Sequence, residues 1–175
     1  MRKIFVTAGH NRNDAGAVHN GVKEADLTME LRDLICEGTD FFKDQDSWNN
    51  ARTIGWLQNN KSQRDVNADI HFNAAVNNQA TGVEVIVANN ASATSRNLAK
   101  SICDELSQVL GIRNRGVKTE SQSARGRLAI VNVTGVSVLI EVCFISNPND
   151  LNAYLKNKEA VALCVRKHLQ ALQKT

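Results

Sequence analysis

Short apolar, β-branched runs alternate along this chain with longer segments whose apolar residues recur at helical spacing. The runs predict strands, and VSVLIEVCFI (136–145) is so continuously apolar that we expect it in the middle of a sheet covered on both faces. In DVNADIH (65–71) apolar residues alternate with polar ones, which predicts a strand with one buried face. The predicted strands cover residues 3–7, 65–71, 83–88, 127–131 and 136–145.

The helical segments are marked by their periodicity and by their ends. Residues 24–37 carry leucines and an isoleucine on one face and stop at Gly38, while residues 92–111 start with Ser/Thr caps and close on Gly111. Asn147-Pro148 predicts the start of a short helix, and an apolar stripe near the end of the chain predicts a terminal one. The polar stretch 39–63 either contains a helix around residues 51–58 or forms a long surface loop.

Strands that alternate with helices favour an α/β fold, with a mainly parallel or mixed sheet between helices. The 175 residues fit one domain, and no repeat or Pro/Ser/Gly-rich linker divides them. The sequence does not fix the oligomeric state, and a monomer is compatible with it.

Composition narrows the functional classes. The formal charge of +3 and the pI near 8.7 make the chain mildly basic, which suits an anionic polymer but falls short of a nucleic-acid-binding pattern. No run reaches the roughly 18 apolar residues of a membrane helix. The amino terminus, MRKIFVTAGH, is too briefly apolar for a signal peptide, so we expect synthesis and retention in the cytoplasm, with a processed exported fragment as the alternative. The four cysteines lack CxxC spacing and are expected to be reduced core residues.

Chemistry-bearing residues stand at the ends of predicted strands. His10 follows the first strand, and His71 ends DVNADIH. Glu141 interrupts the most apolar strand, where an isolated charge would be prohibitively costly, so a cationic group is expected beside it. His10, Glu24 and His71 could hold one zinc ion with an open position for water. Their spacing alone is weak support, and hydrogen-bonded structural histidines are the alternative.

Several sequence blocks occur in a specific order. They are HNRNDAGA, GVKEADL, DIHFNA, GVEV, NRGVK, ARGRLAIV and VLIEVCFISNPND. Together they resemble the zinc-dependent N-acetylmuramoyl-L-alanine amidases of the amidase-3 family, which includes bacterial wall-remodelling amidases and many phage endolysins. The resemblance covers nearly the whole chain, and it implies an α/β fold with a single twisted sheet of about six strands, mixed but mainly parallel, flanked by helices on both faces. It departs at Ala15, where the family's HGGxDPGA loop commonly has proline, and at Phe72, where a small residue is common.

The resemblance implies one Zn²⁺ held by His10, Glu24 and His71, with Glu141 as the catalytic base. The implied substrate is peptidoglycan, cut at the amide bond between the lactyl group of N-acetylmuramic acid and L-alanine. Glu141 would take a proton from water and return it to the leaving amine. An endolysin that is released from the cytoplasm to reach the wall fits the expected localisation.

Further polar residues are weaker candidates. Asn73 and Glu84 could orient the ligands, although an exposed strand carboxylate is an equal alternative for Glu84. Arg125 and Arg127 could meet stem-peptide carboxylates, although a solvated hairpin is favoured for them. His19 and His168 are expected to be ordinary surface histidines, one in a loop and one near a helix end.

Two other functions compete with the amidase. A zinc carboxypeptidase or deacetylase could use the same ligands on a wall-derived substrate. A non-catalytic peptidoglycan-binding module is the third possibility, but binding alone would not require Glu141 inside an apolar strand. A Ser-His-Asp hydrolase is disfavoured because the chain has no GxSxG motif.

Overall fold

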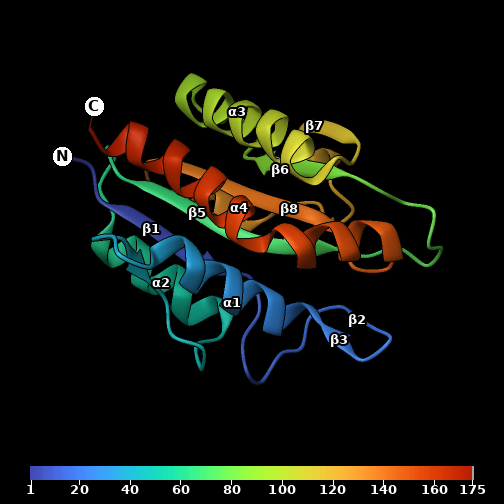
Figure 1. Cartoon of the computed structure of the whole chain (residues 1–175). Coiled ribbons are helices and arrows are strands. Elements are labelled where there is room, and N and C mark those ends of the chain that lie inside the picture. Colours follow the sequence, from blue (N-terminus) through green and yellow to red (C-terminus); the bar gives the residue numbers. More distant parts are fainter. Residues whose placement is uncertain (175) are drawn as a thin grey trace.

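A six-stranded sheet forms the centre of the molecule in the computed structural model, which describes residues 1–174 (Figure 1). In spatial order the strands are β4 (Phe42–Lys43), β1 (Ile4–Ala8), β5 (Val66–Asn73), β8 (Val136–Phe144), β6 (Val83–Val87) and β7 (Asn114–Thr119). The first four are parallel, whereas β6 runs antiparallel to β8 and parallel to β7. The predicted mixed, mainly parallel sheet is therefore confirmed.

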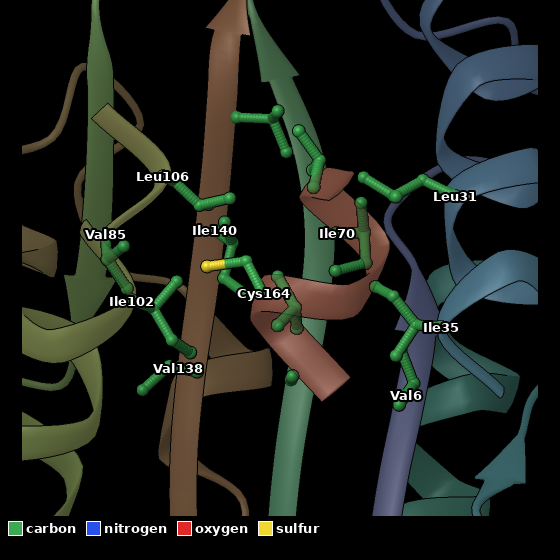
Figure 2. Close-up of a cluster of buried hydrophobic side chains, with 14 of the residues drawn as sticks. Val6, Leu31, Ile35, Ile70, Val85, Ile102, Leu106, Val138, Ile140 and Cys164 are labelled. Carbon is green, nitrogen blue, oxygen red and sulfur yellow. The ribbon is translucent and has the colours of Figure 1, made fainter. Parts of the chain in front are cut away.

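The larger apolar core lies between one face of the sheet and three helices, α1 (Glu24–Cys36), α3 (Ala93–Leu110) and α4 (Pro148–Gln173). Even-numbered residues of β5 and β8 point to this face, since side chains alternate along a strand. Figure 2 shows Leu31 of α1, Leu106 of α3 and Cys164 of α4 over Ile70 and Ile140.

The opposite face of the sheet carries a smaller apolar cluster. Leu57 of α2 (Asn50–Asn60) and Ile130 of the 3₁₀ helix η2 (Ala129–Asn132) cover Phe5 and Leu139 there. Helices therefore flank both faces, as predicted. The odd-numbered polar residues of β5 and β8 share this face, which leaves it less apolar and makes it the side of the candidate site.

The helix ends follow the capping rules that the sequence indicates. Ser92 accepts a hydrogen bond from the Ser95 amide at the start of α3, and Gly111 adopts φ 64° at its end. At α2, the Asn49 side chain accepts from the Arg52 amide, so the stretch 39–63 contains the helix that was one of its two alternatives. No helix within residues 1–174 has the length and apolar character to cross a membrane.

The strand predicted over 127–131 is wrong. The chain forms η2 there, and the Glu120 carboxylate accepts from the Leu128 amide and the Asn132 side chain. The Glu120 side chain thus accepts the backbone hydrogen bond that a neighbouring strand would otherwise accept. Ile130 still packs onto the sheet. The hairpin favoured for Arg125 and Arg127 is likewise a turn-and-loop segment.

Two further predictions need correction. Both faces of β5 are buried, because its polar residues lie beneath other parts of the chain instead of facing water. Asp69 and His71 bond to each other, whereas the Asn67 side chain has no hydrogen-bond partner among residues 1–174. The short helix and the terminal helix form one element, α4, which bends at Asn157 (φ −124°, ψ 17°). Strands β4 and β7 and the two short strands β2 (Val18–His19) and β3 (Val22–Lys23) were not predicted.

Candidate metal and catalytic site

Three side chains from separate elements converge beyond the carboxyl end of β1. His10 lies in the loop after β1, Glu24 is the first residue of α1, and His71 lies near the end of β5. Glu24 Oε2 is 3.2 Å from His10 Nε2, and Glu24 Oε1 is 3.0 Å from His71 Nδ1. One potential ligand atom from each residue lies within 4.8 Å of the other two. The sequence-predicted triad is therefore brought together in space.

A tight β-hairpin returns the chain from His10 to Glu24. Strands β2 and β3 pair antiparallel around Asn20 (φ 48°) and Gly21 (φ 80°), the dipeptide that a two-residue hairpin turn prefers. The Ala17 amide donates to Glu24 Oε2 at 3.0 Å, and the Ala17 carbonyl accepts from the Glu24 amide at 2.8 Å. These bonds fix the Glu24 carboxylate before any ion is present.

The outer nitrogen of each imidazole is held by an aspartate. Asp14 Oδ2 is 3.0 Å from His10 Nδ1, and Asp69 Oδ2 is 3.1 Å from His71 Nε2. The other Asp69 oxygen accepts from the Thr7 hydroxyl at 2.5 Å. Such partners set the tautomer and ring angle of metal-binding histidines. Neither aspartate was predicted from the sequence, where each stands close to its histidine, at i+4 from His10 and i−2 from His71.

Two glycines let the backbone approach the cluster closely. A β-carbon on Gly9 would lie 2.1 Å from His71 Nε2. At Gly16, which has φ 62°, a β-carbon would lie 2.7 Å from both Glu24 Oε2 and the His10 ring. The Gly-rich loop thus leaves room for two rings and a carboxylate that any other residue would displace.

Glu141 lies next to this cluster on β8. It is a direct register partner of His71 on β5 and of Glu84 on β6, so the three side chains form a row on one face of the sheet. Glu141 is 4 % exposed, and its Oε2 has no hydrogen-bond partner among residues 1–174. Burial raises the pKa of Glu141 to about 7, against the opposing influence of His71 and Arg125.

The electrostatics of the cluster favour a cation. Burial would raise the pKa of Glu24, but the two imidazoles of His10 and His71 that face its carboxylate outweigh this and hold the pKa well below its usual range. Burial would lower the pKa of His71, yet the Asp69 and Glu24 hydrogen bonds raise it to about 10. The carboxylates of Glu24 and Asp69 therefore stabilise positive charge at the position where the imidazoles meet.

Glu84 is fixed at the other end of the row. Its carboxylate accepts from the Asn73 side chain at 3.0 Å and from Arg115 Nε at 2.8 Å, so it is a buried, bonded residue and not an exposed one. Arg115, which the sequence analysis did not single out, also lies over the Phe144 ring at 5.0 Å.

The two loop arginines differ in position. Arg125 is exposed, and its Nη1 lies 3.4 Å from His71 Nδ1, the nitrogen that faces Glu24. Arg127 lines a separate cavity with Asn89, Ser121 and Asn132. Phe72 points away from the site, because it packs edge-on against Tyr154 of α4 at 4.7 Å between ring centroids.

The chain belongs to the Amidase_3 family, N-acetylmuramoyl-L-alanine amidase, whose family model matches residues 4–174. It is 28 % identical to N-acetylmuramoyl-L-alanine amidase LytC of Bacillus subtilis over 91 % of this chain and 34 % of LytC. It is 27 % identical to the amidase CwlM of Bacillus licheniformis over 98 % of this chain and 68 % of CwlM. The chain thus spans about a third of the length of LytC.

Solved amidase structures share the fold. An N-acetylmuramoyl-L-alanine amidase from Clostridium difficile 630 superposes with a TM-score of 0.83 at 20 % identity, covering 99 % of this chain and 97 % of that one. A putative amidase from Neisseria meningitidis gives 0.79 at 26 % identity, covering 99 % and 96 %.

The residues present fit a divalent metal. His10 Nε2 is buried and makes no hydrogen bond to residues 1–174, although it faces a carboxylate oxygen. Two imidazoles and one carboxylate are the ligand types of many catalytic zinc sites. The 3.0 and 3.2 Å separations approach the roughly 3.3 Å between neighbouring ligands of a tetrahedral zinc ion.

Proposed function

We propose that this chain is a zinc-dependent N-acetylmuramoyl-L-alanine amidase. The substrate would be peptidoglycan, and the bond cut would join the lactyl carbonyl of N-acetylmuramic acid to the amine of L-alanine. One observation carries the proposal: a His-Glu-His cluster lies beside Glu141, a buried carboxylate with an unpaired oxygen. Family membership supports the same reaction.

His10, Glu24 and His71 would hold the ion. When bound, zinc supplies Lewis-acid chemistry: it lowers the pKa of water and polarises a carbonyl oxygen. Asp14 and Asp69 keep the two imidazoles turned toward Glu24, so the ligand set is arranged in advance.

Glu141 performs the proton transfer in this proposal. Its free Oε2 takes a proton from the attacking water as the new carbon–oxygen bond forms at the lactyl carbonyl. The same carboxyl group then gives the proton to the nitrogen as the carbon–nitrogen bond breaks, which releases the amino terminus of the stem peptide. One water is consumed, and Glu141 returns to its starting state.

The decisive experiment is digestion of purified peptidoglycan. We expect new L-alanine amino termini without new reducing sugars, loss of activity in EDTA and recovery on adding zinc. His10→Gln should be inactive, whereas His19→Gln, a change of the same type in the neighbouring hairpin, should retain activity. Reducing ends without alanine amines would contradict the amidase, and a shortened stem peptide would indicate the carboxypeptidase alternative.

An endolysin role is part of the proposal. The same bond is cut in host wall remodelling and in phage lysis, so the reaction does not separate the two. Producing the chain in the cytoplasm with and without a membrane-permeabilising agent does: an endolysin lyses the cells only when the membrane is opened. Secretion and wall turnover without such an agent would support the exported alternative.

A further inference from the structure

A second cluster of metal-binding side chain types lies between helices α3 and α4. Glu105 comes from α3, and Cys164 and His168 come from consecutive turns of α4. One ligand atom from each lies within 4.8 Å of the other two, and Glu105 Oε2 is 2.8 Å from His168 Nε2. The cluster is on the large-core face of the sheet, opposite the face that bears Glu141.

Cys164 is the unexplained member of the cluster. Its side chain is 4 % exposed, and its sulfur is a free thiol. Figure 2 shows its sulfur directed from α4 toward the side where Ile102 and Leu106 of α3 lie. In α3, Ile102 comes about one turn before Glu105, and Leu106 directly follows it. A core thiol that only filled space would not need an imidazole and a carboxylate next to it.

We propose that Glu105, Cys164 and His168 form a second divalent-metal site, of the zinc or cobalt class, that fastens α4 to α3. A thiolate, a carboxylate and a neutral imidazole together carry two negative charges, which match one divalent cation. The Cys164–His168 spacing of i, i+4 puts both ligands on one helix face, and Glu105 approaches from the other helix.

The protonation balance of the site is explicit. Burial raises the pKa of Cys164 to about 12, and the Glu105 charge adds to this, so the thiol is protonated while no cation is bound. Binding forms the sulfur–metal bond and releases the thiol proton to solvent, as a coordinating divalent ion does elsewhere.

Lys167 is the competing cation. Its Nζ lies 2.6 Å from Glu105 Oε1, but the lysine side chain is 63 % exposed, and such pairs contribute little stability. The lysine can swing into solvent, and Oε2 is in any case the oxygen that faces His168. A cavity of about 260 Å³ adjoins the cluster on one side of His168, which shares its lining with Asn97, Leu98 and Ser101 of α3.

Cobalt(II) provides a probe that reports only this site. A cobalt–thiolate bond gives a near-ultraviolet charge-transfer band, and the candidate catalytic cluster contains no sulfur. We expect the band in wild type and in His10→Gln at about 10 µM free cobalt or below. It should disappear in Cys164→Ser and weaken at least about 10-fold in affinity in His168→Gln. Cys36→Ser, at a half-buried cysteine outside the cluster, should retain it.

Metal counting separates this site from the proposed function. Zinc bound per chain should fall from about two in wild type to about one in either His10→Gln or Cys164→Ser, and to about zero in the double variant. Cys164→Ser should keep amidase activity. No cobalt–thiolate band in wild type, a band that survives Cys164→Ser, or binding only at millimolar metal would overturn the second site and leave the amidase proposal untouched.

Discussion

His71 and Glu141 are direct register partners on the parallel strands β5 and β8, so the ring and the carboxylate project side by side from one face of the sheet. The register, more than any loop, sets the position of the proposed base relative to the proposed ligands. A shift of β8 by one residue relative to β5 would turn Glu141 into the large core and leave His71 on the opposite face.

Glu141→Gln should remove activity while sparing the fold. The amide keeps the shape of the side chain but cannot accept and return a proton, so the rate should fall by about 10²- to 10⁴-fold. The free energy of unfolding of the metal-free protein should stay unchanged or rise by about 1–2 kcal/mol, because a buried charge is lost. Release of alanine amino termini and urea unfolding measure the two effects; undiminished activity would exclude Glu141 as the base.

Asp69→Asn and Asp14→Asn should each weaken zinc binding by about 10- to 100-fold. Each aspartate holds the outer nitrogen of one imidazole, and an amide cannot provide the same charged acceptor. Competition against a chromogenic chelator gives the affinities. Asp26→Asn, an exposed change in the first turn of α1, is the control. Equal affinity in all three variants would mean that the aspartates do not support the ligands.

Gly9→Ala should disrupt the site through sterics alone. The added carbon would lie 2.1 Å from His71 Nε2, so the ring must rotate and lose Asp69. We expect at least about 10-fold weaker zinc binding and a loss of about 1–3 kcal/mol in unfolding free energy. Gly55→Ala inside α2, where a β-carbon meets nothing within 4 Å, should instead stabilise the protein by about 0.5–1 kcal/mol. Calorimetry and zinc titration distinguish the pair.

Lys61 should make stability depend on pH. Its ammonium is buried and donates to the Val136 carbonyl and the Ser137 hydroxyl, and burial lowers its pKa to about 7 from 10.5. Between those values the unfolded chain binds more protons, so Lys61 destabilises most below pH 7, and this cost is relieved as the pH rises toward 10.

Lys61→Met tests this expectation. Relative to the variant, wild type should gain roughly 1–4 kcal/mol of unfolding free energy between about pH 7 and about pH 10. Denaturant unfolding at several pH values measures the difference. The exposed control Lys156→Met should show no such trend, and a flat difference for Lys61→Met would contradict the pKa shift.

The helices and strands that form the large core could be predicted from the sequence because each is marked by residues within its own segment. Apolar periodicity with Ser92 and Gly111 at its ends defines α3, and the unbroken apolar run defines β8. Strand β7 gave no such signal, because NRGVKT lies at the sheet edge and buries little. The 127–131 segment has the apolar residues of a strand, and they do pack on the sheet. Its Leu128 amide, however, donates to the Glu120 carboxylate and not to a neighbouring strand, and the apolar pattern does not show this bond.

The site was only partly accessible to the same reasoning. His10, Glu24 and His71 could be named because family resemblance linked residues that spacing alone could not. Asp14 and Asp69 act through ring nitrogens whose direction depends on backbone geometry, and Arg115 reaches Glu84 across neighbouring strands. Asn20-Gly21 is a local signal for the short hairpin that returns Glu24 to His10, and this hairpin was not among the predicted elements.

Successive side chains of β5 point to opposite faces of the sheet, and the two faces have different roles. Asp69 and His71 lie on the face of the candidate site. Ile70 and Phe72 lie on the face of the large core, where Phe72 packs against Tyr154. Substitutions at odd-numbered positions of this eight-residue strand therefore affect the candidate site, whereas substitutions at even-numbered positions affect the packing of the core. The core-facing residues of β5 can therefore be exchanged for others of similar volume while the site-facing residues stay the same.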